Sequence, residues 1–336
     1  MDNRRQKKPI MKKFLFLFVT LCLMLLVTSC SKTIFAITTG DENLTSLTKV
    51  TDNDEPCIDP WGGDYGKDLF FSVCEKKKYY NIYKKDNPFS SALSQKTSGK
   101  NINQAPSYCE DLDKIAFRCQ NEGNGTSDIF MMANNGGKSL TQITESTDAF
   151  ENNPCFSPDG KFLVYDKQSY SVYKKSNFLG IGNKTYLVEN SEIWMKNLQT
   201  GENILLTKGY QPRFSPDGSK IAYVKYASDA KSTSIWIMSP DGSNQTQITD
   251  AKKGFAMAPC WSPDGSKIIF QSANKNQKDD ADLFVINVDG NNLTQLTVNK
   301  SWDMMPYWTK DGYIYFSSDR GNKKGNYQIW RFRISD

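Results

Sequence analysis

The residues of this chain that could carry out chemistry are acids and thiols, because the sequence contains no histidine. This composition excludes a Ser-His-Asp triad, a Cys-His dyad and every histidine-ligated zinc or iron site. The sequence also lacks a Gly-x-Ser-x-Gly nucleophile motif, a phosphate-binding Walker loop and a dinucleotide fingerprint. We therefore expect no catalytic residue of these classes and no cofactor.

Paired carboxylates are the one hydrolytic arrangement that the composition leaves open. Several acids lie in the segments that should lead into inner strands: Asp52, Asp54, Glu55, Glu145, Asp148, Glu151, Asp250 and Asp303. The alternative interpretation, which we favour, is that these are solvated acids of surface turns.

Three cysteines recur at one position of a repeat and could hold a metal. Cys57, Cys155 and Cys260 each follow a proline that opens a repeat unit, so they could approach a central axis with threefold symmetry. Three thiolates suit a soft transition metal, whereas small buried residues beside the axis are the alternative interpretation. Arg213 and Tyr307 follow the corresponding prolines of two other units and join the cysteines as candidates for a tunnel mouth.

Disulfides are a second use for the cysteines, because they are permitted in an exported protein. Cys109 should lie opposite Lys114 in its hairpin, which leaves Cys119 roughly 17 Å away at the rise of a strand. Cys109 and Cys119 should therefore not bridge. Cys74 and Cys119, on equivalent second strands of neighbouring units, are the better candidate pair.

A repeated phrase positions these residues. Phe-Ser-Pro-Asp-Gly occurs at 156–160 and 214–218, and close copies occur at 261–265 and 308–312. The prolines that mark the units are spaced by 50, 48, 58, 47 and 47 residues: Pro56, Pro106, Pro154, Pro212, Pro259 and Pro306. A period of this kind indicates six units that bury their apolar faces against their neighbours.

Each unit has the pattern of four short strands. In the fifth unit, β-rich runs at 259–262, 267–270, 282–287 and 293–297 are separated by turns that contain Asp-Gly. Proline presets φ in the Ser-Pro-Asp-Gly turn, aspartate can accept a backbone N–H, and glycine takes a positive φ. Six such units predict an all-β fold, a six-bladed β-propeller of four-stranded blades.

The N-terminal strand should close the ring. The last unit ends without the Leu-Thr-x-Leu-Thr strand that closes the others, and a similar phrase occurs at 44–48. We therefore expect this segment to complete the sixth blade and to leave no open sheet edge. The propeller then spans 44–336 as a monomeric ring.

The Pro-x-(Phe/Trp)-Ser-Pro-Asp-Gly phrase, with its closing Leu-Thr-x-Leu-Thr, resembles the TolB-type propeller repeat. The resemblance covers residues 44–336 and is strongest in units three to five. It implies a propeller and a scaffold role in the cell envelope, where the family engages a peptidoglycan-associated lipoprotein. We do not expect the α/β domain that precedes the family's propeller, so the resemblance implies a general scaffold role without a named partner. Some related propellers are uronate lyases, but those use a histidine-containing metal site.

The first 29 residues have the layout of an export signal. A basic head precedes an apolar run at 14–27, which is shorter than the roughly 20 residues that a membrane-spanning helix needs. Translation could start at Met1 or at Met11. Residues 27–30 resemble a bacterial lipobox, so Cys30 is the expected lipidation site, with simple secretion as the alternative.

The lipid would anchor the chain to a membrane through a tether at 30–43. Ser31 after the cysteine resembles outer-membrane routing, with the periplasmic and outer faces both open. Without the signal, the chain carries 36 basic and 36 acidic residues. This balance removes the electrostatic argument for nucleic acid as a partner.

Unit three is about ten residues longer than its neighbours, and the excess lies at 166–191. The segment contains aromatic residues among lysines: Tyr170, Tyr173, Lys174, Lys175, Phe178, Lys184 and Tyr186. A long loop of this composition is typical of a partner-binding surface. A loop that folds onto its own blade is the alternative.

The function that we expect is a lipid-anchored, non-enzymatic scaffold that binds an envelope protein or peptide. The alternative is a surface lipoprotein that binds or cleaves a glycan with acids and aromatic residues such as Trp302, Tyr307 and Trp308. An enzyme of this second kind requires two carboxylates about 5 to 10 Å apart beside an exposed ring.

Overall fold

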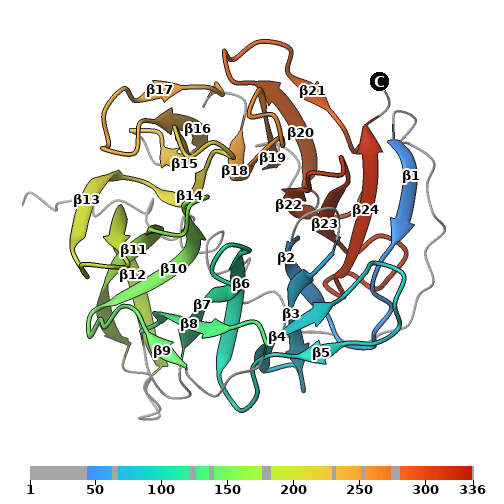
Figure 1. Ribbon diagram of the computed structural model, residues 1–336, viewed down its shortest axis with the longest axis horizontal. Helices are drawn as coiled ribbons and strands as arrows, with labels where there is room; N and C mark the ends of the chain where they lie inside the picture. The colour runs from blue at the N-terminus through green and yellow to red at the C-terminus, as the bar shows by residue number, and fades with distance from the viewer. Residues whose placement is uncertain are drawn as a thin grey trace, which may run out of the picture.

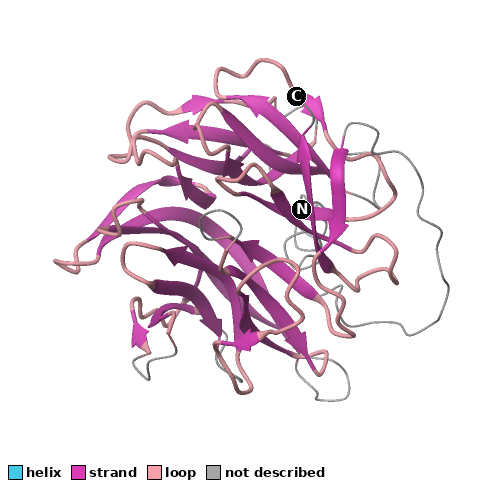
Figure 2. Ribbon diagram, turned by 45° about the vertical axis from the view of Figure 1, so that its right-hand side comes forward, coloured by secondary structure: helices cyan, strands magenta, loops and turns pink. Residues whose placement is uncertain are grey.

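The computed structural model describes residues 44–62, 67–120, 126–135, 140–175, 183–228, 232–250, 254–273 and 281–334, without the side chains of 170–189. Every regular element in these residues is a β-strand (Figure 2). No helix in this part of the chain could span a membrane. The expected signal peptide, the tether with Cys30, and Phe178 lie outside the described residues.

The described strands form two sheets of four strands and two of eight. The first eight-stranded sheet contains β2 (Cys57–Trp61), β3 (Leu69–Glu75), β4 (Tyr79–Lys85), β5 (Ser94–Gln95), β6 (Ile102–Cys109), β7 (Lys114–Gln120), β8 (Asp128–Ala133) and β9 (Thr141–Gln142). The second contains β14 (Tyr210–Phe214), β15 (Ile221–Tyr226), β16 (Thr233–Met238), β17 (Thr246–Gln247), β18 (Phe255–Trp261), β19 (Lys267–Ala273), β20 (Asp282–Asn287) and β21 (Thr294–Gln295).

The four-stranded sheets lie on opposite sides of the molecule. One contains β10 (Ala149–Phe156), β11 (Phe162–Lys175), β12 (Asn183–Asn197) and β13 (Asn203–Lys208). The other contains β22 (Asp303–Trp308), β23 (Ile314–Ser318), β24 (Gln328–Ile334) and β1 (Leu44–Lys49). Figure 1 shows the sheets around a common centre, with the first strand of each sequence unit innermost.

The repeated Ser-Pro-Asp-Gly phrase forms the turn that the sequence predicts. In the fourth unit, the Ser215 hydroxyl donates to Asp217 Oδ1 over 2.6 Å and accepts from the Lys220 N–H over 2.9 Å. Asp217 also accepts from the Ser219 N–H, and Gly218 has a φ of 73°. The third and fifth units repeat these contacts. The phrase is therefore a structural device that joins the first and second strands.

The closing threonine of a unit bonds to its third strand. Thr144, Thr249 and Thr297 each accept, at Oγ1, a backbone N–H of β8, β16 or β20 over 2.9 Å. Thr51 makes the same contact with the Ile329 N–H over 2.8 Å, although 278 residues separate the two. The strand β1 before Thr51 pairs antiparallel with β24. The N-terminal segment therefore occupies the position of a closing strand in the last unit, as predicted.

Each innermost strand carries a bulge beside a proline. The residue before that proline has a positive φ of 51–56°, and the register with the second strand shifts there; these residues are Asp59, Ala105, Asn153, Gln211, Ala258 and Met305. Such a bulge adds one residue to a strand and bends it. In the first unit the proline is therefore Pro60, and the choice of Pro56 as its marker is wrong.

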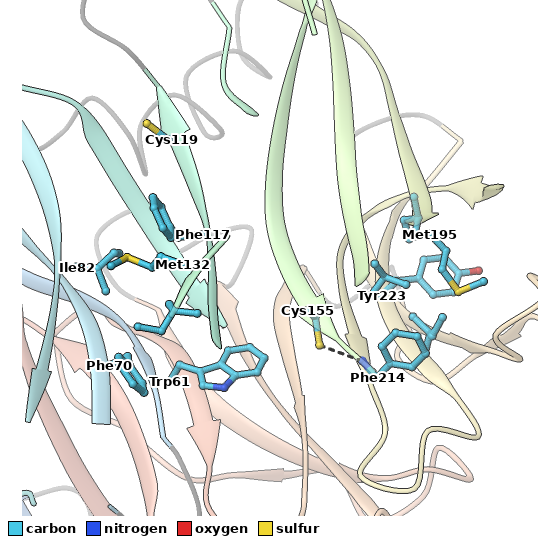
Figure 3. Packing of buried hydrophobic residues seen from close by; sticks show 14 of the residues in the cluster. Trp61, Phe70, Ile82, Phe117, Cys119, Met132, Cys155, Met195, Phe214 and Tyr223 are labelled. Carbon is cyan, nitrogen blue, oxygen red and sulfur yellow. Dashed lines mark hydrogen bonds between the residues drawn. The ribbon is translucent and has the colours of Figure 1, made fainter. Parts of the chain in front are cut away.

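Apolar side chains of successive units pack together, as the repeat predicts. The largest cluster joins Trp61 of the first unit to Phe117, Cys155 and Tyr223 of the following three units (Figure 3). Their neighbours along the strands, such as Ala116, Phe156 and Val224, point to the other face of each sheet and are buried in further apolar clusters. Each sheet therefore buries side chains on both faces.

The extra length of the third unit is a β-hairpin. β11 and β12 pair antiparallel from Phe162↔Asn197 out to Lys175↔Asn183. The expectation of a long loop at 166–191 is therefore wrong for the described residues, because both strands continue outward as a paired hairpin. The backbone pairs Tyr170 with Val188 and Lys174 with Lys184, while the side chains expected to bind a partner lie outside the description.

None of the six cysteines in the described residues forms a disulfide. The register pairs Cys109 with Lys114, as predicted. The candidate pair of Cys74 and Cys119 is wrong. Cys74 packs with Ile58 and Tyr80, whereas the Cys119 side chain belongs to the large apolar cluster.

We expect Ser215→Ala to lower the free energy of unfolding by about 1 to 2 kcal/mol, because its buried hydroxyl joins two parts of the turn. Ser219→Ala is the matched control, since Ser219 is exposed and donates only to Asp217. Urea denaturation of both variants measures the difference. Equal losses in the two variants would contradict the importance of the buried hydroxyl.

Candidate functional site

Side chains of one unit hold the bulges of the next. The Ala105 N–H donates to Asp59 Oδ2 over 3.2 Å, and the Gln211 N–H donates to Asp166 Oδ1 over 3.0 Å. Two further bulges repeat the arrangement, with the Ala258 N–H on Gln211 Oε1 and the Met305 N–H on the Gln271 side chain, both over 2.8 Å. These bonds form a polar belt between neighbouring units around the centre of the molecule.

Two acids of this belt, Asp59 and Asp166, interact electrostatically with Arg118, and we call the three residues the charge cluster. Arg118 and Asp166 are buried, and Asp59 is half-buried. Arg118 lies on β7 and donates to the side chains of Gln104 over 3.0 Å and Gln120 over 2.8 Å. Burial lowers the pKa of Arg118 to about 10, while the charges of both aspartates oppose this shift.

The two aspartates are shifted in the direction that burial dictates. Asp166 is fully buried, and burial raises its pKa to about 6 although Asn153 Nδ2 and the Gln211 N–H donate to it. Burial also raises the pKa of Asp59, against the bonds from Ala105 and Ser72 and the charge of Arg213. Each aspartate accepts a backbone N–H of the following unit, so these two bonds hold neighbouring units together.

A second group of side chains lies across the centre and comprises Trp61, Arg213 and Tyr307; we call it the axial group. The Arg213 guanidinium carbon lies 5.0 Å from the centre of the Trp61 ring, although these residues belong to the first and fourth units. The Trp61 and Tyr307 rings have their centres 4.9 Å apart. A cation over an aromatic face is attracted by the ring's quadrupole. Trp61 is buried, and Arg213 and Tyr307 are half-buried.

The axial group contains two of the five residues that we expected at a tunnel mouth. Arg213 and Tyr307 converge with Trp61, which the sequence analysis missed because it took Pro56 as the first marker. Pro60 is 46 residues before Pro106, which fits the other spacings better and could have identified Trp61.

The three cysteines that we expected at the tunnel mouth do not belong to the axial group. Cys155 Sγ accepts the Phe214 N–H over 3.4 Å (Figure 3), and Cys260 Sγ accepts the Trp308 N–H over 3.3 Å. Both sulfurs thus receive a backbone bond from the following unit. Cys57 lies four residues before Trp61 and packs in another apolar cluster, so the three cysteines are not equivalent. Among the described residues, no three acids or cysteines gather as metal ligands.

The acids that we interpreted as solvated divide into two kinds. Asp52, Asp54, Glu145, Asp148 and Asp250 are exposed, and Glu55 is half-buried. Asp303 is fully buried beside Arg320 and Ser318, and burial raises its pKa. Glu151 is 3% exposed. The interpretation as surface acids is therefore wrong for these two.

The three aromatic residues that we named for the alternative of glycan binding also make contacts within the fold. Trp302 is buried among Ala273, Ala281 and Met304. The Trp308 backbone N–H donates to Cys260, and the Tyr307 ring packs at a tilt against the Trp61 ring. These contacts give no support to a sugar-binding platform made from the three rings.

We expect Asp166→Asn to change how stability depends on pH. A folded pKa near 6, above an unfolded value near 4, means that wild-type stability rises as pH falls from 7.5 to 4.5. The neutral variant lacks this gain, which should amount to about 2 kcal/mol in wild type. Urea denaturation across this pH range measures the difference between the two proteins.

Asp217→Asn is the control for this prediction. Hydrogen bonds from Ser215 and Ser219 lower the pKa of Asp217 to about 2. The stability that its ionised carboxylate contributes is therefore lost only as pH falls below about 4. Parallel curves for wild type and Asp166→Asn between pH 7.5 and 4.5 would rule out a raised pKa at Asp166.

Comparison with known proteins supports the architecture. Residues 193–336 match the family model described as the TolB beta propeller domain. The fold is similar to the structure of a putative TolB from Agrobacterium tumefaciens, with a TM-score of 0.58, 19% identity, and coverage of 85% of this chain and 93% of that one. It is also similar to an oligogalacturonate lyase from Vibrio parahaemolyticus, with a TM-score of 0.55, 16% identity, and coverage of 90% and 97%.

A similarity in sequence extends to a longer protein. The chain is 30% identical over 119 residues to an uncharacterized peptidase of Bacillus subtilis, YuxL, which corresponds to 34% of this chain and 15% of that protein. The match therefore covers only a small part of the relative's length. Together with the family match, these similarities confirm that the chain carries the TolB-type propeller repeat, over residues 193–336 by the family model.

Proposed function

We propose that this chain is a non-enzymatic propeller of the bacterial cell envelope that binds a protein or peptide at the centre of one face. The observation that carries the proposal is the axial group, in which Trp61, Arg213 and Tyr307 meet from three separate units. Trp, Tyr and Arg are the residue types that dominate the binding energy of protein interfaces, and they act at the interface centre.

Arg213 is the residue of this group that can contact a partner most directly. Its guanidinium donates to the carbonyl oxygens of Pro212 over 3.2 Å and Asn153 over 3.5 Å, and its central carbon lies 5.0 Å from the centre of the Trp61 ring. A guanidinium held in this way can offer its remaining donors to a carboxylate or carbonyl of a partner. The half-buried Tyr307 adds apolar surface beside it.

The proposal includes a closed ring of six four-stranded blades over residues 44–336. The antiparallel pairing of β1 with β24 and the Thr51 contact with Ile329 support closure by the N-terminal segment. Partly buried Leu44 and Leu47 pack with the apolar cluster of the last units, which also favours closure. A closed ring keeps the axial group rigid, and rigid sites lose less entropy on binding.

A binding role agrees better with the hydrogen bonds of three aspartates than an enzymatic role does. Asp59, Asp166 and Asp303 each accept hydrogen bonds from protein groups, so their carboxylates serve the fold. The similar proteins include a lyase and a peptidase, so proteins related to this chain include enzymes. We do not extend their activities to this chain.

The envelope location rests on the first 43 residues together with the resemblance to TolB structures. We propose that residues 1–29 are removed as a signal, that Cys30 carries the lipid and that 30–43 form a tether to the outer membrane. A lipid anchor would keep the ring close to partners in the envelope.

Photo-crosslinking in the producing bacterium tests the binding proposal. We expect p-benzoylphenylalanine at Tyr307 to form covalent protein adducts, and Arg213→Ala to reduce them because loss of a central Arg costs about 2 kcal/mol or more. Leu205, exposed on the outer strand β13, is the control position. Adducts that are equal at both positions, or that persist in folded Arg213→Ala, would overturn the proposal.

Metabolic labelling tests the anchor separately. We expect the wild-type chain to incorporate labelled palmitate and to sediment with membranes, and Cys30→Ser to lose both properties. Cys57→Ser is the matched control, since Cys57 is buried in the folded chain. Labelling that survives in Cys30→Ser would exclude this cysteine as the lipid site.

A further inference from the structure

The N-terminal strand β1 enters the fold at one end of the molecule. Leu44 pairs with Ile334, the last residue of β24, so the chain before Leu44 connects at the end that holds the turns between third and fourth strands. This connection lies at the outer edge of the sixth unit (Figure 1). Cys30, the proposed lipid site, precedes Leu44 by 14 residues, which reach about 50 Å when fully extended. The rim around β1 is therefore the part of the molecule that a lipid anchor would hold nearest to a membrane.

Four side chains beside this connection pack as alternating rings and guanidinium groups, and we call them the rim cluster: Phe89, Arg331, Tyr313 and Arg333. The guanidinium carbon of Arg331 lies 4.4 Å from the centre of the Phe89 ring and 4.1 Å from that of Tyr313. The Arg333 guanidinium carbon lies 4.1 Å from the centre of the same Tyr313 ring. Contacts between cations and aromatic faces are attractive. Arg333 pairs with Thr45 of β1, so the cluster borders the N-terminal strand.

The rim cluster presents an apolar ring and a cation to solvent. Phe89, in the connection between β4 and β5, is 77% exposed, the highest value among the large apolar side chains of the described residues. Its N–H donates to Asn87 Oδ1 over 2.9 Å, so the exposed ring sits on a hydrogen-bonded turn. Arg333 is exposed, Tyr313 is half-buried and Arg331 is buried. Arg331 therefore supports the Phe89 ring from inside the fold, while Arg333 faces solvent.

The repeat does not require arginine in this cluster. The residue two places after the N–H that the closing threonine accepts is Arg331 in the sixth unit and apolar in three others: Met131, Ile237 and Val285. The first unit has Lys84 at this position, but Asp68 and Asp86 neutralise it over 2.7 and 3.1 Å. Neither arginine of the rim cluster forms an ion pair with a carboxylate in the part of the chain that the structure describes. The positive charge of this rim is therefore not neutralised by a neighbour.

We propose that the rim cluster is where the molecule touches the bilayer that holds its lipid anchor. Phe89 can enter the boundary between headgroups and acyl chains. Arg333 donates to the Asp311 carbonyl oxygen over 2.8 Å, and its remaining guanidinium donors can bind a lipid phosphate. Aromatic rings with neighbouring cations are typical of membrane interfaces. The contact involves the outer rim alone, so the axial group at the centre stays open to a partner.

A bilayer fits this surface better than a protein does. Phe89 protrudes from a turn, whereas the residues that dominate a protein interface fill well-packed pockets at its centre. The inference rests on the lipid anchor proposed above, because one exposed ring and one exposed cation bind a membrane too weakly to hold an unanchored chain.

Photo-crosslinking of the lipidated chain in vesicles tests the contact. The vesicles contain phosphatidylethanolamine and phosphatidylglycerol with radiolabelled acyl chains, and p-benzoylphenylalanine replaces Phe89. We expect labelled lipid adducts at this position and none at Leu205, which is 49% exposed on β13 across the molecule. Equal lipid labelling at the two positions would overturn the proposal. So would protein adducts in place of lipid adducts at position 89 in membranes of the producing bacterium.

Charge reversal tests the part that Arg333 plays. In the chain with the crosslinker at position 89, we expect Arg333→Glu to reduce the lipid adducts, because a carboxylate repels lipid phosphate. Arg333→Lys keeps the charge and should keep the adducts, which a purely structural role of the stacked guanidinium would not allow. Lys208→Glu, the same change of charge on β13, is the matched control. Melting temperatures show that each variant is folded, and unchanged adducts in folded Arg333→Glu would contradict the proposal.

Failure of the anchor and failure of the contact give different results. If Cys30 is not the lipid site, palmitate labelling survives in Cys30→Ser, whatever happens at Phe89. If the anchor is correct and the rim contact is wrong, the chain carries palmitate and sediments with membranes, but the crosslinker at position 89 gives no lipid adducts.

Discussion

The left-handed residue before the proline of each innermost strand is the constraint on which the rest of this structure depends. A residue other than glycine costs roughly 1 to 3 kcal/mol in this conformation and persists only where its surroundings enforce it. In four of the six units a side chain of the preceding unit accepts the N–H of that residue, as Asp166 does for Gln211 and Gln271 does for Met305. In these units the neighbour helps to hold the strained residue, so the stability of one unit depends on the next.

The bulge also decides which side chains reach the centre. The residue after the proline is structurally equivalent in all six units, and its side chain makes one of two kinds of contact. Ser107, Cys155 and Cys260 accept a backbone N–H of the following unit, at 3.3 to 3.4 Å. Trp61, Arg213 and Tyr307 instead contact one another. Three positions therefore give a backbone contact between units, while the other three bring aromatic and cationic side chains together at the centre.

Sequence reasoning succeeded where the structure is local. The Ser-Pro-Asp-Gly turn, the third strand at 282–287 and the pairing of Cys109 with Lys114 depend on neighbouring residues, and all are present as predicted. The closing strand at 44–48 was also predictable, because a repeat that lacks one strand requires it elsewhere. Trp61 was missed because the first unit has two prolines, and the backbone conformation of Asp59 shows that Pro60 is the relevant one.

Burial was the property that the sequence could not reveal. Glu151 and Asp166 both look like acids near the ends of strands, yet both are buried, and the structure treats them differently. Asp166 accepts bonds from Asn153 and Gln211, which compensate for the loss of hydration. Glu151 keeps an oxygen without a donor, a cost of roughly 1 to 3 kcal/mol. The corresponding position of the fifth unit holds Ala256 and avoids this cost. The corresponding position of the sixth unit holds Asp303, whose buried carboxylate accepts from Ser318 and Arg320. An acid at this position is therefore buried by the fold in two units, and whether its charge is compensated depends on the side chains that the second strand and its following loop supply.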